Sequence, residues 1–243
     1  MFPMRQPGGV SDGGVLDLPD PASPPTVPST RRHAREICDV QGGDGQTGPR
    51  LLVVAGLHGN EPAGILAAQR VGEALLRMRL PVTGRFTALA GNLKALDGGR
   101  RFVDRDLNRA WQAERVAALR AGAAATSSED GEQAELMDRL APLIESAPAE
   151  VFVLDLHTTS SRSAPFILFA DTLPNRGFAT QVPLPLVLGL EEQVDGAMLD
   201  YLESRYRLVT MGVEGGQHDD PASVDNLESV LWIALVRAGC IDP

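Results

Sequence analysis

The sequence predicts an α/β protein in which one mixed, largely parallel sheet lies between layers of helices in a single three-layer domain. From residue 51 onward, short apolar runs alternate with longer segments whose apolar residues recur at helical spacing. Several of the short runs are almost continuously apolar, as expected for strands that are covered on both faces. Because 43% of the 243 residues are hydrophobic, the chain can form one sizeable core.

Strands are expected wherever a short apolar run is bounded by turn residues. Five such runs occur, at residues 51–56, 85–90, 151–158, 165–170 and 208–213. The first run ends at a cluster of Gly, Asn and Pro, and the third ends in a histidine. Polar residues that follow such strands lie at the edge of an open sheet where ligands bind.

Helices are expected where apolar residues lie three or four positions apart. Two segments fit this spacing, at residues 65–80 and 132–144. Residues 112–128 are rich in Ala and Arg and then in Ser and Thr, so we expect a helix followed by a loop there. Pro142 is an unfavourable residue inside the segment at 132–144. The last helix is expected to begin at Asp220 and Pro221, an N-cap followed by proline, and to end at Gly239.

Residues 1–49 have a different composition from the rest of the chain. Pro and Gly interrupt almost every stretch, apolar residues are sparse, and no run resembles the core of a signal peptide. We expect a disordered leader over residues 1–49 and the folded domain over residues 50–243. His33 is assigned to this leader or to a first edge strand.

The composition favours a cytoplasmic enzyme. The net charge is −10 and no basic stripe occurs, which argues against nucleic acid and anionic membrane surfaces as partners. The two cysteines, Cys38 and Cys240, are far apart, so a disulfide framework and a Cys-rich metal site are not expected. No apolar run reaches the length of about 18 residues that a membrane span needs.

Two strand ends carry residues that can bind a metal ion. His58 and Glu61 follow the strand at 51–56, and His157 ends the strand at 151–158. A catalytic zinc takes three protein ligands, and two histidines with one glutamate are such a set. His-x-x-Glu alone is common in polar loops, but His157 in the same context favours one zinc site.

Two further motifs carry polar groups of functional interest. Residues 101–109 contain three arginines, two aspartates and an asparagine, a composition that suits either anion recognition or a solvated, self-paired loop. Glu214 ends the strand at 208–213 and precedes two glycines, so it is either a general base or part of a turn. Two interpretations remain for the hydroxyl residues 158–161 and for His218: they line the site, or they belong to a turn or loop.

Four motifs in this order resemble one known family. They are Gly56–Glu61, Asp106–Arg109, Asp155–His157 and Glu214–Gly216. Together they are similar to the succinylglutamate desuccinylase/aspartoacylase family, a branch of the zinc carboxypeptidase-like hydrolases. The resemblance covers roughly residues 50–240 and implies a zinc hydrolase fold for that region.

The resemblance implies roles for the residues around the metal. His58, Glu61 and His157 match the zinc ligands, and Glu214 matches the base that deprotonates the water held by zinc. Asp106 matches an aspartate that orients a ligand histidine through its far ring nitrogen.

The resemblance also implies substrate contacts. Arg101 matches the arginine that polarises the scissile carbonyl. Asn108 and Arg109 match the pair that grips a substrate carboxylate.

Two departures from the family pattern concern substrate selection. Family members continue into a smaller β-rich C-terminal domain that walls the substrate channel, and this domain is expected to be absent here. Substrate selection would then differ, or a homo-oligomer or partner chain would complete the channel. Aspartate-specific members place an arginine upstream of the base, whereas Arg205 and Arg207 lie at other offsets, so N-acetylaspartate is not assigned as substrate.

Three hypotheses on function follow. The leading one is a zinc amidohydrolase that removes an acyl group from an N-acyl amino acid or a similar small carboxylate-bearing amide. The second is a metallocarboxypeptidase that acts on peptide C-termini. The third is a catalytically weak metal- or ligand-binding domain.

Overall fold

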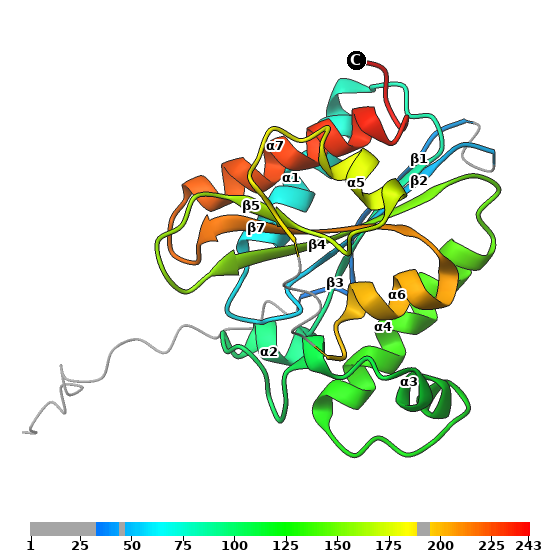
Figure 1. Cartoon of the computed structure of the whole chain (residues 1–243), viewed down its shortest axis with the longest axis vertical. Coiled ribbons are helices and arrows are strands. Elements are labelled where there is room, and N and C mark those ends of the chain that lie inside the picture. The colour runs from blue at the N-terminus through cyan, green and yellow to red at the C-terminus, as the bar shows by residue number, and fades with distance from the viewer. Residues whose placement is uncertain (1–32, 44–46, 189–194) are drawn as a thin grey trace, which may run out of the picture. The chain divides into compact units, whose positions relative to one another are not determined.

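The computed structural model describes residues 33–43, 47–188 and 195–243. These residues form a mixed sheet with helices on both faces (Figure 1). The strands are β1 (Glu36–Gln41), β2 (Arg50–Ala55), β3 (Arg85–Ala90), β4 (Val151–Thr159), β5 (Phe166–Leu168), β6 (Leu186–Val187) and β7 (Val209–Gln217). Their order across the sheet is β1-β3-β2-β4-β7-β5-β6.

The central part of the sheet is parallel, as predicted. Strand β2 runs parallel to both β3 and β4, and β4 runs parallel to β7. Antiparallel pairs occur where β1 meets β3 and where β5 meets β7. The carboxyl ends of β2, β4 and β7 therefore lie along one edge of the sheet.

Two helical layers cover the sheet (Figure 1). One layer consists of α1 (Ala63–Met78), α5 (Leu173–Ala179) and α7 (Ala222–Arg237). The other layer is built mainly by α3 (Ala113–Arg120), α4 (Ser128–Glu145) and α6 (Met198–Tyr206). The short α2 (Leu93–Asp97) and the 3-10 helix η1 (Leu107–Arg109) lie in the long connection that follows β3.

Alternation along the strands divides the apolar side chains between two cores. In β2, Leu51 and Val53 join the core beneath α1 and α7, whereas Leu52 and Val54 join the core beneath α4 and α6. In β4, Val151 and Val153 face the α4 side in the same way. Asp155 and His157 continue this face of β4, so the candidate ligand His157 points to the α4 and α6 side.

The expected boundary between leader and domain at residue 50 is wrong. Strand β1 pairs with β3, and the buried Arg35 donates to the carbonyl of Ala90 at 2.6 Å and to Glu132 at 2.5 Å. The polar residues of β1 hid this strand, because it is a partly exposed edge strand that needs no apolar run. Residues 1–32 and 44–46 of the predicted leader lie outside the described residues.

The predicted long elements are present, and Pro142 lies inside α4, close to the end of that helix. The five predicted strands correspond to β2, β3, β4, β5 and β7. The short elements α2, α5, α6, β6 and η1 were not predicted, because they are too brief to show a periodic pattern. Among the described residues, none of the helices combines the length and apolar character that crossing a membrane requires.

Candidate metal centre and active-site cavity

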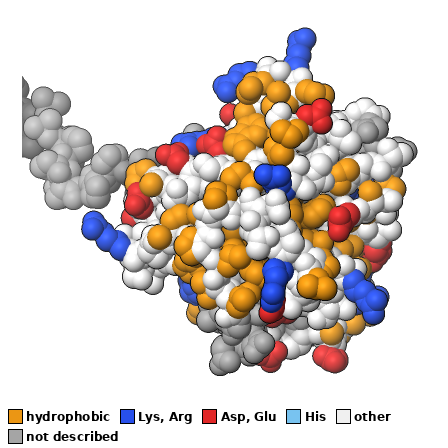
Figure 2. All heavy atoms as spheres, turned by 45° about the horizontal axis from the view of Figure 1, so that its top comes forward, with side chains coloured by type: hydrophobic (Ala, Val, Ile, Leu, Met, Phe, Trp, Pro, Cys, Tyr) orange, Lys and Arg blue, Asp and Glu red, His pale blue; other side chains and the backbone are white. Residues whose placement is uncertain are grey.

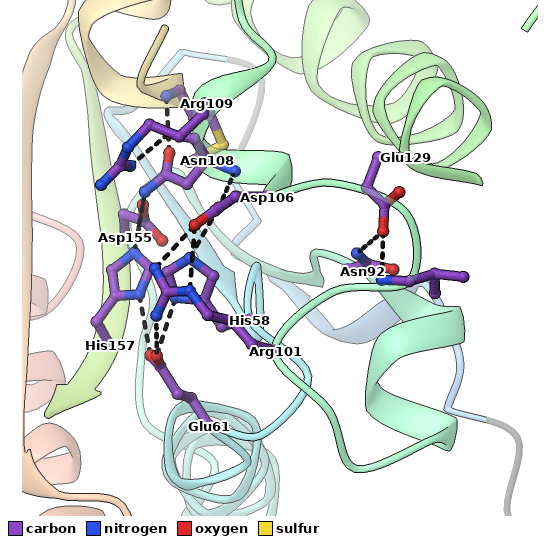
Figure 3. A network of polar contacts seen from close by, with 12 residues as sticks. His58, Glu61, Asn92, Arg101, Asp106, Asn108, Arg109, Glu129, Asp155 and His157 are labelled. Carbon is purple, nitrogen blue, oxygen red and sulfur yellow. Dashed lines mark hydrogen bonds and ion pairs between the residues drawn. The ribbon is translucent and has the colours of Figure 1, made fainter. Parts of the chain in front are cut away.

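Three buried side chains meet at the carboxyl edge of the sheet (Figure 3). His58 lies in the turn after β2, Glu61 lies just before α1, and His157 lies in β4. One ligand atom from each residue lies within 4.8 Å of those of the other two. The turn that carries His58 needs Gly59, because a Cβ at that position would lie 2.0 Å from the backbone of Ala95. The predicted ligand set is thus brought together by the fold.

The Glu61 carboxylate bridges the two imidazoles. Its Oε1 atom lies 2.9 Å from Nδ1 of His58, and its Oε2 atom lies 3.0 Å from Nδ1 of His157. The backbone N–H of Thr158 also donates to Oε2 at 3.0 Å. These contacts fix the carboxylate between the ring nitrogens.

A second carboxylate stands behind each imidazole. Nε2 of His58 lies 3.0 Å from Asp106, and Nε2 of His157 lies 2.8 Å from Asp155. Because an ionised carboxylate only accepts hydrogen bonds, each Nε2 carries a proton, and in the neutral ring each Nδ1 is left as an acceptor. Two acceptor nitrogens and the Glu61 carboxylate then face one another in a buried space. This arrangement needs a cation or protons between its members, and its donor set matches that preferred by zinc.

The pKa shifts indicate the same need for positive charge. Burial raises the pKa of Glu61, but hydrogen bonds from His157 and His58 outweigh burial and hold that pKa well below its ordinary value. Burial lowers the pKa of His157, whereas Asp155 and Glu61 raise it well above its ordinary value. The field of these carboxylates therefore stabilises a positive charge at the ring nitrogens.

The loop from Arg101 to Arg109 is held through its backbone by one buried carboxylate. Glu129, at the start of α4, accepts the backbone N–H groups of Val103, Asp104 and Arg105 at 2.7, 3.1 and 3.2 Å. The Asn92 side chain donates to the same carboxylate at 3.1 Å (Figure 3). Three successive amides that converge on an anion fix the course of this loop.

Asp106 links this loop to the metal cluster. One of its oxygens caps η1 by accepting the N–H of Asn108 at 2.9 Å and also contacts His58. The other oxygen accepts from Nε and Nη2 of Arg101 at 3.1 and 2.8 Å. Nη1 of Arg101 reaches within 3.7 Å of Glu61, so this guanidinium lies beside the cluster as predicted.

Asn108 and Arg109 lie next to His157. The amide oxygen of Asn108 accepts the N–H of Met198 at 2.9 Å, and its nitrogen donates to Asp155 over 3.5 Å. The Arg109 side chain is exposed, and its Nη1 donates to the carbonyl of Asn108 at 2.7 Å. The guanidinium of Arg109 thus lines the same cavity as the cluster, and no carboxylate of the described residues is hydrogen-bonded to it.

Glu214 faces the same space from β7. It pairs with His157 across the sheet, and burial raises its pKa above the ordinary value. Its Oε2 atom is buried and has no hydrogen-bond partner within the described part of the chain. An unpartnered carboxylate with a raised pKa has the properties of a general base.

A cavity of about 210 Å³ unites these groups. Seven of the eight predicted site residues line it: His58, Glu61, Arg101, Asn108, Arg109, His157 and Glu214. The eighth, Asp106, supports His58 from behind. Thr158 also lines the cavity, and its hydroxyl lies 2.8 Å from Nδ1 of His218, which is not itself one of the residues that line the cavity.

Two residues of the site were not predicted as such. Asp155 stands two positions before His157, and this spacing places both on one face of a strand, which is a signal the sequence contained. Glu129 gave no local signal, because it lies 24 to 26 residues from the amides that it binds.

Comparison with known proteins identifies the family. Residues 47–229 match the family model described as the succinylglutamate desuccinylase/aspartoacylase catalytic domain. The chain belongs to this family. The resemblance stated from the four motifs is thereby confirmed.

Curated family members resemble only part of this chain. It is 35% identical to a succinylglutamate desuccinylase from Pseudomonas paraeruginosa over 108 residues, which are 40% of this chain and 32% of the relative. It is 33% identical to an N-acyl-aromatic-L-amino acid amidohydrolase (carboxylate-forming) from Xenopus tropicalis over 123 residues, 49% of this chain and 37% of the relative. The chain thus spans about a third of the length of these relatives.

Solved structures share the fold. A succinylglutamate desuccinylase from Chromobacterium violaceum matches with a TM-score of 0.65 and 19% identity, over 83% of this chain and 66% of that chain. The product-bound ectoine utilization protein EutE (DoeB) from Ruegeria pomeroyi matches with a TM-score of 0.64 and 21% identity, over 84% of this chain and 61% of that chain. These neighbours support the predicted single α/β domain.

Proposed function

We propose that this protein is a zinc-dependent amidohydrolase that cleaves the acyl amide bond of an N-acyl amino acid or a similar small carboxylate-bearing amide. The arrangement of His58, Glu61 and His157 carries the proposal, since Asp106 and Asp155 leave both Nδ1 atoms turned towards Glu61. Membership of a family whose named relatives are amide hydrolases supports it.

The three ligand residues would hold one zinc ion per chain. When bound, the ion would supply Lewis-acid chemistry that favours ionisation of a water molecule and polarises the substrate carbonyl. Asp106 and Asp155 would keep both rings in the tautomer that this requires.

Glu214 would take the proton from the attacking water and return it to the leaving amine. Its buried, unpartnered oxygen and raised pKa suit this exchange. Arg101 would place positive charge next to the oxyanion that develops on the carbonyl oxygen.

Arg109, with Asn108, would hold the substrate carboxylate and so orient the amide for attack. A guanidinium fork binds a carboxylate through two parallel hydrogen bonds. Asn108 keeps its oxygen on Met198, so its contribution would come from the loosely held amide N–H groups.

Metal analysis together with a substrate panel tests the proposal. The purified protein should contain about one zinc ion per chain and should hydrolyse N-acyl amino acids faster than short peptides. A structural neighbour, Csd4 from Helicobacter pylori, binds a tripeptide, so short peptides are the second class of substrate in the panel. If C-terminal residues are released from peptides faster than N-acyl amino acids are hydrolysed, the protein is a metallocarboxypeptidase instead. If it binds metal but hydrolyses neither class of substrate, it is a metal- or ligand-binding domain.

A further inference from the structure

Beyond the metal cluster and the arginine loop, most of the cavity wall is apolar, and Asp200 and Thr210 are its polar members. This part of the wall comes from β5 and the residues after it, from the start of α6 and from the middle of β7. Its main members are Leu168, Ala170, Ala197, Leu199 and Gly212. None of them can pair with a charged group of a substrate.

Gly212 forms the floor of this region. It pairs with Asp155 of β4 and with Leu168 of β5, and it precedes Glu214 by two residues. Residues two apart in a strand point to the same face and lie roughly 7 Å apart. A group attached one or two carbon atoms from the scissile bond can therefore extend from Glu214 to the space above Gly212.

The fold does not require glycine at position 212. A Cβ there would lie 3.5 Å from Cβ of Leu168 and 3.6 Å from Cδ1 of Leu199, which are ordinary contacts. By contrast, a Cβ at Gly215 would lie 2.5 Å from the side chain of Leu227, so packing explains that glycine. Packing does not explain Gly212, and the side chain that it lacks leaves room inside the cavity.

The charges around the cavity limit the number of substrate carboxylates. Among the described residues, its wall carries two guanidinium groups, and that of Arg101 is already bound to Asp106. Four carboxylate side chains line the same wall: Glu61, Asp155, Asp200 and Glu214. Together with the two guanidinium groups, a divalent ion at the cluster would balance these four carboxylates and would leave no surplus of positive charge. Arg109 therefore accommodates one substrate carboxylate, and a second would lie near like charges.

Building on the proposed function, we infer that the space above Gly212 is a subsite for an uncharged, apolar group of the substrate. The preferred substrates are then N-acyl amino acids with a single carboxylate and an apolar acyl group or side chain. Substrates with two or three carboxylates, such as N-acetylaspartate and N-succinylglutamate, are disfavoured.

The inference is tested with the zinc-loaded enzyme on matched substrates. N-acetylleucine and N-butyrylglycine carry one carboxylate, and N-acetylaspartate and N-succinylglutamate carry more. We expect kcat/KM to be at least about tenfold higher for one or both of the first pair than for either of the second. Hydrolysis of the acidic substrates at equal or higher kcat/KM would overturn the subsite and leave the amidohydrolase intact. No hydrolysis of any N-acyl amino acid would overturn the proposed function as well.

Two substitutions address the subsite directly. Gly212→Ala fills part of it without a backbone clash, so kcat/KM should fall several-fold for the apolar substrates and change little for N-acetylglycine. Leu199→Arg adds a cation to the wall and should raise kcat/KM for N-acetylaspartate relative to N-acetylleucine. Gly177→Ala is the control, because its Cβ meets nothing within 4 Å and it lies outside the cavity wall. An unchanged substrate preference in both subsite variants would place the apolar group elsewhere.

Discussion

The metal cluster and the arginine loop belong to one site but are held in different ways. In the cluster, each imidazole is gripped at both nitrogens by carboxylates, and all three ligand side chains are buried. In the loop, the side chains of Arg101 and Arg109 are exposed, and order comes through the backbone that Glu129 binds.

This difference shows how one cavity combines rigidity with access. A metal ligand must stay within a few tenths of an ångström of its place, which paired strand ends and buried hydrogen bonds ensure. A substrate-binding arginine must instead remain exposed to meet its ligand. Anchoring the loop at Val103 to Arg105 fixes the course of the chain that carries Arg109 without using the guanidinium group of Arg109. Figure 2 shows a mixed surface on one face of the molecule, with scattered basic, acidic and apolar side chains and no broad basic patch.

The largest effect is expected from removing a ligand of the cluster. His157→Ala should lose most of the bound zinc and all hydrolysis, because two ligands cannot replace the three-residue set. Metal content per chain and the rate of amide hydrolysis measure both losses. His33→Ala, which alters a histidine outside the cluster, should keep both. Full zinc occupancy in His157→Ala would remove His157 from the ligand set.

Substitution of the proposed base, Glu214, should slow the chemical step without removing the metal. Glu214→Gln keeps size and polarity but cannot accept a proton, so kcat should fall by roughly 10² to 10⁴ with zinc retained. Steady-state kinetics and metal analysis provide the test, with the exposed Glu73→Gln as control. If kcat is unchanged, another group is the base.

Substitution of Glu129, which binds the backbone of the arginine loop, should lower activity without removing the metal. Glu129→Gln replaces a carboxylate that accepts three amides, so Arg101 and Arg109 should shift and kcat/KM should fall on the order of 10². Zinc content should stay near that of the parent enzyme. Glu135→Gln, with an exposed side chain six residues further along α4, is the matched control. Equal loss of zinc and activity in Glu129→Gln would show that the two regions are not independent.

The smallest effect is expected at the substrate carboxylate. Arg109→Ala should mainly raise KM, by about 10 to 100-fold, because it removes a charged hydrogen-bonding partner of the substrate. Esterified or amidated substrates should then lose their disadvantage relative to free acids. The exposed Arg77→Ala serves as control. If Arg109→Ala still prefers free carboxylates, then Arg105, Arg205 or Arg207 would bind the substrate carboxylate instead of Arg109.

Those three arginines are held elsewhere in the structure. Arg105 pairs with the buried Asp130, Arg205 lies over the ring of Tyr206, and Arg207 lines a neighbouring hollow that shares Ala170 and Asp200 with the cavity. None of them lines the cavity that contains Arg109, as far as the described residues show. Because Arg109 does line this cavity, its substitution is the sharper test.

The site residues were predictable because their signals are local. His58 and Glu61 lie three residues apart after an apolar run, and Asp106 to Arg109 form one short motif. The same locality explains the helices and strands with strong periodicity. Strand β1 and the short helices lacked such a signal, since tertiary contacts rather than their own apolar pattern stabilise them.

By itself, the sequence determined the alternation of strands and helices and the residue types available at the strand ends. The polarity of a strand and the spacing of a motif are properties of neighbouring residues, so they can be read along the chain. Only the tertiary structure decided that Asp106 stands behind His58, that Glu129 anchors the arginine loop and that Gly212 opens onto the cavity. Each of these depends on groups far apart in sequence, and their distances are fixed only when the sheet and its two helical layers pack together.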